Sequence, residues 1–218
     1  MRADTATLRP RRLPPAPDRS PMSALPQSHS FNETQQRILA AAITCVKQWG
    51  VEKTSLNDIA KQAGVTRPTV YRYFASRNEV LTTALMQSAY ALGERIMAHM
   101  AGMAEPVERY VETIVFAIGQ IPNEPYLSIV MGSDFMSYVA ADALSNQEGW
   151  ALCLALMRQI LDGLDLADDA LQDITEVTIR LVLSLLTTTG PRKRSPEELR
   201  LLLQRCLAPM LERNGARA

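Results

Sequence analysis

The stretch from Ser55 to Phe74 decides the fold and reads SLNDIAKQAGVTRPTVYRYF. Apolar residues at helical spacing give a first short helix one buried face: Leu56, Ile59 and Ala60. Gly64 stands just past the end of that helix, where the chain often takes a left-handed conformation that glycine adopts at little cost. The Thr66 hydroxyl can cap a second helix, and Pro68 falls in the first turn of that helix, where a missing N–H costs nothing.

The second helix has one buried side and one polar side. Val70 and Phe74 are four residues apart and face inward. The other side carries arginine, threonine and tyrosine, which suit contacts with DNA grooves and phosphates: Arg67, Thr69, Tyr71, Arg72 and Tyr73. Two short helices joined by a tight turn, the second with such a face, predict a helix-turn-helix DNA-binding motif.

A longer helix precedes this motif. Its apolar residues fall on one side: Ile38, Leu39, Ala41, Ala42, Cys45, Val46 and Trp49. We expect Thr34 to cap it and Gly50 to end it, after which Thr54 or Ser55 caps the next helix. This helix supplies the small core on which the helix-turn-helix rests.

The order of these residues resembles the DNA-binding domain of TetR-family (tetracycline-repressor-like) regulators. The resemblance extends from Thr34 to about Leu81 and rests on Ile38-Leu39-x-Ala41-Ala42, Gly50-Val51, Thr54-Ser55-Leu56-x-Asp58-Ile59-Ala60, Ala63-Gly64-Val65 and Tyr71-x-Tyr73-Phe74. It implies that Arg67 and Thr69 meet base edges, and that Tyr71 and Arg72 meet the DNA backbone or flanking bases.

The resemblance also bears on Arg77, at the start of the next helix. Family members usually have lysine there, in contact with a phosphate, and arginine keeps the charge while adding a planar fork. Arg77→Ala would then weaken binding to all DNA about equally. The candidate DNA-binding residues are Ser55, Thr66, Arg67, Thr69, Tyr71, Arg72, Tyr73 and Arg77.

The charges of this 218-residue chain sum to zero but are unevenly divided. Residues 1–78 carry 12 Lys or Arg against 5 Asp or Glu, whereas residues 79–218 carry 11 against 18. A basic first third and an acidic remainder indicate an N-terminal module that meets a polyanion and a C-terminal module that does not. A chance division of charges is the alternative.

Composition and spacing argue against several other classes of protein. Three scattered cysteines and two isolated histidines provide no metal-ligand spacing and no disulfide framework, so we expect no metal. With no nucleophile–base constellation and no glycine-rich phosphate loop, we expect neither an enzyme nor a cofactor. No apolar run approaches the ~20 residues of a membrane span, and there is no apolar signal segment, so we expect a cytoplasmic protein.

Three regions are predicted along the chain. Residues 1–30 hold six prolines and five arginines and form a disordered arm, either an inert leader or a basic arm that adds phosphate or minor-groove contacts. Residues 31–78 form the DNA-binding domain, and residues 79–218 form a larger helical domain for effector binding and dimerisation. The fold class is therefore all-α.

The larger domain begins with a long helix. Ser76 and Glu79 form a capping box, and the helix runs from about Arg77 to Met100, long enough to leave the DNA-binding domain. The resemblance implies that it links ligand binding mechanically to DNA, although a plain connector is the alternative. Further helices are predicted over Pro106 to Ile121, Tyr126 to Leu144 (one bent or two short) and Asn146 to Leu164.

Methionine and aromatic residues gather in this middle region. Methionine adapts to cavities that accept varied apolar ligands, and the resemblance implies an effector pocket, although ordinary core packing explains any one of these residues as well. Because few charges lie in these helices, we expect an apolar effector. The candidate pocket residues are Met97, Met100, Tyr110, Phe116, Met131, Phe135, Tyr138, Trp150 and Met157.

Two C-terminal helices follow. Asp168 begins one, which runs to about Thr188, and a capping box at Ser195 begins the last, which Pro209 bends or ends. Val177 and Leu201 fall outside the main apolar stripes, and the resemblance implies a four-helix dimer interface. Its candidate residues are Ile174, Val177, Leu181, Leu185, Leu199, Leu202, Leu203 and Met210. The basic loop 192–194 is read as a solvated connection.

These observations predict a sequence-specific transcriptional regulator. We expect a homodimeric repressor that binds a palindromic operator in double-stranded DNA and is released by a small apolar effector, with no membrane partner. An architectural or effector-independent DNA-binding protein is the alternative. It would share residues 34–78, but no small molecule should stabilise it.

Overall fold

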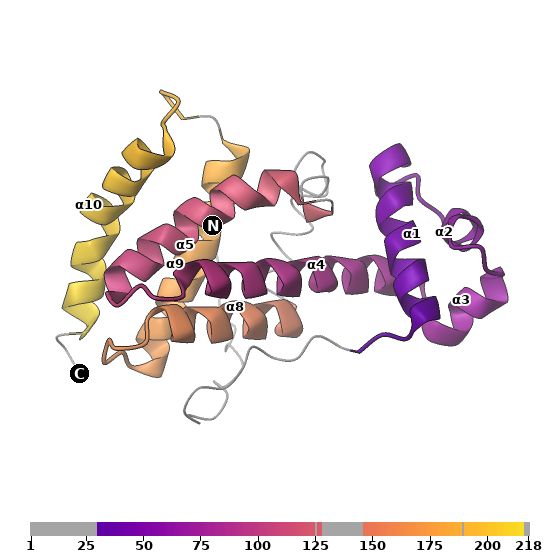
Figure 1. Cartoon of the computed structure of the whole chain (residues 1–218), viewed down its shortest axis with the longest axis horizontal. Coiled ribbons are helices and arrows are strands. Elements are labelled where there is room, and N and C mark those ends of the chain that lie inside the picture. The colour runs from indigo at the N-terminus through magenta and orange to yellow at the C-terminus, as the bar shows by residue number, and fades with distance from the viewer. Residues whose placement is uncertain (1–29, 125, 128–145, 189, 216–218) are drawn as a thin grey trace, which may run out of the picture.

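The computed structural model describes residues 30–124, 126–127, 146–188 and 190–215, and every regular element in these ranges is a helix (Figure 1). The prediction of an all-α fold is confirmed. All but the last residue of the predicted N-terminal arm lies outside the described residues. So does nearly all of the predicted helical region 126–144, with the candidate pocket residues Met131, Phe135 and Tyr138.

Three helices form the N-terminal unit: α1 (Glu33–Trp49), α2 (Leu56–Gln62) and α3 (Arg67–Tyr73). They lie together at one end of the molecule, in indigo and purple in Figure 1. Their apolar faces meet in one core, whose members include Ile38, Leu39, Cys45, Val46, Ile59, Val70 and Phe74. The inward positions predicted for Val70 and Phe74 are confirmed.

The start of α1 differs from the prediction. Asn32, not Thr34, caps the helix: the Asn32 side chain accepts the Gln35 N–H at 3.0 Å, and the Gln35 side chain accepts the Asn32 N–H at 3.1 Å. This reciprocal pair satisfies two N–H groups that a single threonine hydroxyl cannot, so the helix begins two residues earlier. Gly50 ends α1, and Ser55 caps α2, as predicted.

The long helix α4 (Arg77–Met100) matches its predicted bounds and belongs to both parts of the protein. Ser76 caps it, but Glu79 accepts the N–H of Ala75 rather than that of Ser76, so the predicted capping box is only half formed. The first turns of α4 contribute Val80, Leu81 and Ala84 to the N-terminal core. Its last turns contribute Leu92, Ile96 and Met100 to a second core.

The second core is built around α5 (Pro106–Gln120), which packs against α4, α8, α9 and α10. A short 3-10 turn, η1 (Ile121–Asn123), follows α5, and α8 (Gln147–Ile160) lies alongside α4 (Figure 1). The last two helices, α9 (Asp168–Thr187) and α10 (Pro196–Gly215), complete this part of the molecule.

Helix α8 ends at Ile160, four residues before its predicted end at Leu164. The side chain of Arg109, on α5, donates from Nε to the Ile160 carbonyl at 2.8 Å and from Nη2 to the Asp162 carbonyl. These bonds satisfy carbonyl oxygens that a continued helix would have used, and the chain turns through Gly163 at φ +97°.

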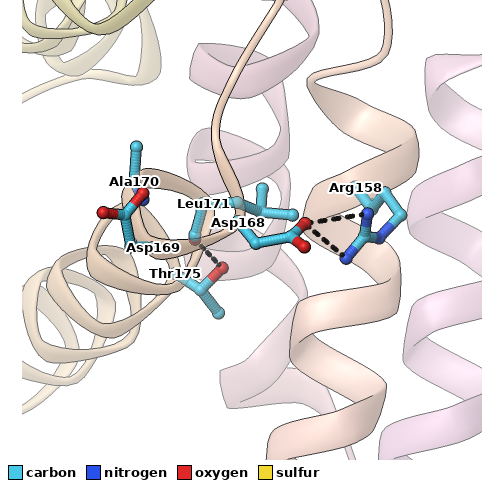
Figure 2. Close-up of polar contacts among 6 residues, drawn as sticks. All are labelled: Arg158, Asp168, Asp169, Ala170, Leu171 and Thr175. Atoms are coloured by element: carbon cyan, nitrogen blue, oxygen red, sulfur yellow. Dashed lines mark hydrogen bonds and ion pairs between the residues drawn. The ribbon is translucent and has the colours of Figure 1, made fainter. Parts of the chain in front are cut away.

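The junction between α8 and α9 is polar (Figure 2). Figure 2 shows the side chains of Arg158 and Asp168 pointing toward each other, with Nη2 and Oδ1 3.4 Å apart. Both side chains are partly exposed, so this pair orients the start of α9 more than it stabilises the fold. The predicted start of α9 at Asp168 is confirmed, and Thr175 donates to the Leu171 carbonyl at 2.7 Å one turn later.

The capping box predicted for the last helix is confirmed. The Ser195 N–H donates to Glu198 Oε2 at 2.8 Å, and the Glu198 N–H donates to Ser195 Oγ at 3.2 Å. Pro209 lies inside α10, which continues to Gly215, so of the two predicted alternatives, a bend or an end at this proline, the end is excluded.

Candidate nucleic-acid interface

The turn between α2 and α3 has the hydrogen bonds with which glycine ends a helix. Gly64 has φ +63°, its N–H donates to the Lys61 carbonyl at 3.2 Å, and the Val65 N–H donates to the Ala60 carbonyl at 3.0 Å. This pair of bonds is a Schellman motif, and its closing glycine takes the left-handed conformation. The predicted role of Gly64 is confirmed, and the motif sets the direction in which α3 leaves α2.

Arg37, on α1, forms hydrogen bonds to the same turn. Its Nη2 donates to the Ala63 carbonyl at 2.7 Å and to the Gly64 carbonyl at 3.4 Å. The turn is therefore tied to α1 as well as closed by its own bonds. Sequence reasoning missed this contact, because its acceptors are backbone carbonyls more than 20 residues along the chain, and those carry no side-chain signal.

Gly64→Ala is expected to lower the free energy of unfolding by about 1–2 kcal/mol, because alanine is strained at a φ of +63°. The added Cβ would lie 3.5 Å from the end of the Arg37 side chain, an ordinary contact, so the strain comes from the backbone.

Gly119→Ala is the matched control. Gly119 lies in α5 with open space around it, so alanine there should raise stability by up to about 1 kcal/mol. Urea unfolding of both variants measures the two effects, and the same sign for both would contradict the assigned role of Gly64.

Helix α3 presents two arginine–tyrosine pairs. Arg67 Nη2 donates to the Tyr71 hydroxyl at 3.1 Å, with the guanidinium carbon 5.4 Å from the Tyr71 ring centroid. Arg72 Nη2 donates to the Tyr73 hydroxyl at 2.9 Å, with its guanidinium carbon 4.8 Å from that ring. Each ring holds a guanidinium in place and leaves other N–H groups of that arginine directed outward. This face can therefore donate to phosphates and base edges.

The structure brings six of the eight candidate DNA-binding residues together on α3 or at its cap: Thr66, Arg67, Thr69, Tyr71, Arg72 and Tyr73. Thr66 accepts the Thr69 N–H at 3.3 Å, and the hydroxyls of the two residues lie 2.8 Å apart. Tyr73 is half-buried against the N-terminal core. Only part of that ring is therefore available to DNA.

Ser55 lies at the start of α2. Its hydroxyl donates to Asp58 Oδ2 at 2.5 Å, and this bond holds the pKa of the Asp58 carboxyl below its ordinary value. The Ser55 N–H also donates to Asp58 Oδ2, so Ser55 caps the N-terminus of α2.

Arg77 has a different environment from the one that the resemblance implies. All three nitrogens of its guanidinium donate within the chain: Nε to the Thr54 carbonyl, Nη2 to the Val51 carbonyl and Nη1 to Asn78 Oδ1. Thr54 is buried, and its carbonyl directly precedes Ser55, the cap of α2. Arg77 therefore ties the start of α4 to the turn that positions the helix-turn-helix.

All the candidate pocket residues within the described ranges except Trp150 belong to the second core or its edge. Met100, Tyr110, Trp150 and Met157 are buried, whereas Met97 and Phe116 are half-buried. The Phe116 ring stacks on His99, with centroids 4.4 Å apart. The Thr178 hydroxyl donates to the Ile174 carbonyl, so the Tyr110 hydroxyl is the donor in its 2.6 Å bond to Thr178. That bond joins α5 to α9.

Three buried polar atoms have no hydrogen-bond partner among the described residues: Thr113 Oγ1, the Tyr126 hydroxyl and Trp150 Nε1. A buried polar group without a partner costs about 1–3 kcal/mol. Tyr126 follows η1 and is fully buried in the N-terminal core, so the second part of the protein reaches into the first at this residue.

Tyr126→Phe is expected to raise the free energy of unfolding by about 1 kcal/mol, because it removes a buried hydroxyl that has no hydrogen-bond partner in the described part of the chain. Tyr110→Phe is the matched control and should lower the free energy by about 1 kcal/mol, because it removes the bond to Thr178. Urea unfolding at neutral pH compares them, and a loss of stability in Tyr126→Phe would contradict the assignment.

The two variants should also differ from the wild type in alkali. Burial raises the pKa of Tyr126 above its ordinary value, against a smaller opposing effect of Arg77, and burial also raises the pKa of Tyr110. A raised pKa gives stability that is complete below the unfolded pKa of about 10 and is lost as pH rises through the folded value. Each phenylalanine variant should therefore lose less stability above that pH than the wild type.

The candidate dimer residues divide into three groups. Ile174 and Leu203 are buried in the protomer's own core, which removes them from any surface that a partner could contact. Val177 is 45% exposed. The others are half-buried, and all of them except Leu202 lie at the edge of the second core: Leu181, Leu185, Leu199, Leu202 and Met210. Leu201, on α10, is 51% exposed and was not among the predicted interface residues, although it had been noted outside the apolar stripe.

Within the described ranges, no three His, Cys, Asp or Glu side chains come close enough together to hold a metal ion. None of the described helices is both long and apolar enough to cross a membrane.

Residues 38–84, from α1 into the first turns of α4, match the family model described as bacterial regulatory proteins, tetR family. This part of the chain therefore has the DNA-binding domain of the tetR family. It is 36% identical over 92 residues to an uncharacterised HTH-type transcriptional regulator of Mycobacterium tuberculosis H37Rv, a match that covers 42% of this chain and 46% of that protein. It is 33% identical over 95 residues to the probable acrEF/envCD operon repressor of Escherichia coli K12, covering 43% of each.

These matches span about half the length of the curated TetR-family relatives. A TetR-family transcriptional regulator from Streptomyces coelicolor has the same fold, with a TM-score of 0.61 at 19% identity over 81% of this chain and 99% of that one. The relatives are named as transcriptional regulators, so regulation through DNA, not catalysis, is the function of the family.

Proposed function

We propose that this TetR-family regulator is a repressor that binds a palindromic operator as a homodimer and is released by a small apolar effector. The observation that carries the proposal is the exposed face of α3. Its two arginines are each held against a tyrosine, while Val70, on the other side of the helix, is locked in the core. A rigid helix with directed donors suits the major groove.

The proposed contacts follow from the position of each side chain on α3. Arg67 and Thr69 lie in its first turn and meet base edges, as the first residues of a recognition helix do. Tyr71 is 45% exposed and, with Arg72, reaches the DNA backbone or flanking bases. A bidentate contact between arginine and guanine is worth about 1–3 kcal/mol, so Arg67 carries the largest share of specificity.

We propose two functional domains, residues 31–78 and 79–218, with α4 shared between them. Val80, Leu81 and Ala84 pack into the core that supports the helix-turn-helix, and Tyr126 enters the same core. A displacement of α4 would therefore move the recognition helix. This continuity supports a mechanical link between effector binding and DNA.

The dimer is proposed to form through α9 and α10, which lie at the opposite end of α4 from the helix-turn-helix (Figure 1). Val177 and Leu201 are large apolar residues that each helix leaves exposed, and half-buried leucines accompany them. Covering such residues is favourable in proportion to the apolar area removed from water. One recognition helix in each protomer then reads one half of a palindrome.

The proposed effector site lies in the second core, among residues that include Met100 and Met157. The core residues there are apolar, but Thr113 on α5 and Trp150 on α8 each have a buried polar atom without a partner among the described residues. An apolar effector with a hydrogen-bond acceptor for Trp150 Nε1 would relieve that cost. If the effector binds more tightly when the two recognition helices have a different spacing, effector binding weakens operator binding. The coupling free energy between the two sites would be of order 1–3 kcal/mol.

The experiment that tests DNA reading compares Arg67→Ala with Arg192→Ala. Arg67→Ala is expected to lower affinity for the operator by about 10- to 100-fold, since a good base contact is worth about 1–3 kcal/mol. Thr69→Ala should have a smaller effect of the same kind. Fluorescence anisotropy with a labelled operator measures the affinities.

Arg192→Ala removes an exposed arginine from the basic loop before α10 and is expected to leave operator affinity unchanged. Normal operator binding by Arg67→Ala would show that α3 enters DNA in another orientation. A separate test addresses the effector: a protein without one would show no rise in melting temperature with any small apolar molecule.

A further inference from the structure

Arg37 is a basic residue of α1 that is held beside the start of the recognition helix. Its Nη2 donates to the carbonyls of Ala63 and Gly64, and Gly64 stands two residues before Thr66, the cap of α3. Because both carbonyls belong to the turn that leads into α3, the guanidinium keeps one position relative to the start of that helix. The contacts proposed above for α3 do not use this charge.

The bonds to the turn occupy only part of the guanidinium. An arginine side chain has five N–H groups on three nitrogens, and Nη2 alone donates to the turn. Within the described ranges, Arg37 has no ion pair and no acceptor for Nε or Nη1. The residue is exposed, so these N–H groups face solvent. A guanidinium already held in place can bond an anion at a smaller cost in side-chain ordering than a free one.

Arg77 has the opposite arrangement. All three of its nitrogens donate within the chain, to the Val51 and Thr54 carbonyls and to Asn78 Oδ1, and the residue is half-buried. A guanidinium whose nitrogens are all used has few donors left for a phosphate oxygen, whereas Arg37 keeps two nitrogens for one. Of these two arginines, Arg37 is therefore the one that can bind DNA as well as hold the helix-turn-helix together.

The surface around the turn is positively charged. Lys61, in the last turn of α2, and Arg67, in the first turn of α3, are exposed on either side of the turn that Arg37 bonds. Glu33 lies one turn before Arg37 on α1, and the two form no ion pair in the described part of the chain. Three cations against one carboxylate favour a polyanion at this place.

We infer that Arg37 binds a backbone phosphate of DNA while it holds the turn before α3. One side chain then both positions the recognition helix and anchors it on the duplex. The contact rests on the proposed function, because that function places the duplex against α3. A phosphate contact fixes the position of a protein on DNA without reading sequence, so Arg37 contributes to the binding of operator and of other DNA alike.

The test is a salt titration of DNA binding by the full chain, followed by fluorescence anisotropy. The two labelled duplexes are one from the region upstream of the protein's own gene and a scrambled one of the same length. Arg37→Gln removes the charge but keeps an N–H donor for the turn, whereas Arg37→Ala removes both. Each variant should lower the slope of log affinity against log salt by about one on both duplexes, and should weaken both by a similar factor. A residue that only positions α3 would lower affinity for the upstream duplex without changing that slope.

Two variants serve as controls for the slope. Lys47→Gln removes an exposed positive charge ten residues further along the same helix, about 15 Å away, and should leave the slope unchanged, as should Arg77→Ala. An unchanged slope in both Arg37 variants, an equal loss of slope in Lys47→Gln, or no DNA binding at all would overturn the inference. Equal binding of both duplexes by the wild type would count against the proposed function, yet the slope on the scrambled duplex would still decide the role of Arg37.

Discussion

Val177→Glu combined with Leu201→Glu should convert the proposed dimer to a monomer and lower operator affinity by about 10²- to 10³-fold. Both side chains are about half exposed on the two C-terminal helices. In a dimer formed through these helices, four carboxylates would lose water without gaining partners, which costs several kcal/mol. A monomer brings only one recognition helix to the palindrome and loses the contacts of the second.

Light scattering after gel filtration gives the mass, and anisotropy with a labelled operator gives the affinity. Ala91→Glu places the same acidic side chain at an exposed position of α4 and is expected to remain dimeric and to bind DNA normally. If the double variant remained a dimer, α9 and α10 would not form the interface. If it became a monomer with unchanged operator affinity, the proposal that two protomers together bind one operator would be wrong.

Arg77→Ala is expected to lower the free energy of unfolding by about 1.5–3 kcal/mol, because hydrogen bonds from a charged group to buried acceptors are lost. The acceptors are the Val51 and Thr54 carbonyls, which fix the entry to α2. Operator affinity should fall as well, because the helix-turn-helix is then less firmly held on α4. Urea unfolding and a salt titration of DNA binding measure the two effects.

Arg77→Lys separates this role from a phosphate contact. Lysine keeps the charge but cannot place two N–H groups in a planar fork, so it should recover little of the lost stability. If Arg77 holds the chain together, the slope of log affinity against log salt should stay unchanged in both variants. Two results would show that Arg77 contacts a phosphate instead. One is full recovery of stability in Arg77→Lys, and the other is a salt slope of DNA binding that falls by about one in Arg77→Ala but not in Arg77→Lys.

Local signals predicted the helix-turn-helix well. Gly64, Thr66 and the inward pair Val70 and Phe74 act within a few residues of themselves, so their effects are visible in the sequence. Asn32 was overlooked in favour of Thr34, although the Asn32–Gln35 spacing is itself a local capping pattern.

Contacts between distant segments were not predictable in the same way. Arg37, Arg77 and Arg109 all donate to backbone carbonyls far along the chain, and any residue type can supply a carbonyl. This explains why α8 was predicted too long and why the bonds of Arg77 within the chain were not predicted. The candidate pocket could not be separated from ordinary core by residue type, since both use the same methionines and aromatic rings.

Three arginines tie separate elements of the chain together. Arg77 ties α4 to the turn before α2, and Arg37 ties α1 to the turn before α3. Arg109 ties α5 to the end of α8. A displacement of α4 would therefore act on the turn before α2 through Arg77.

The most direct test of the central claim is binding to the DNA upstream of the protein's own gene, titrated against salt with nonspecific competitor present. We expect saturable binding to a short palindrome by a dimer, which survives competitor and is weakened about 10- to 100-fold in Arg67→Ala. Binding that disappears with competitor on this DNA and on a genome-wide set of selected fragments would contradict sequence-specific recognition by α3.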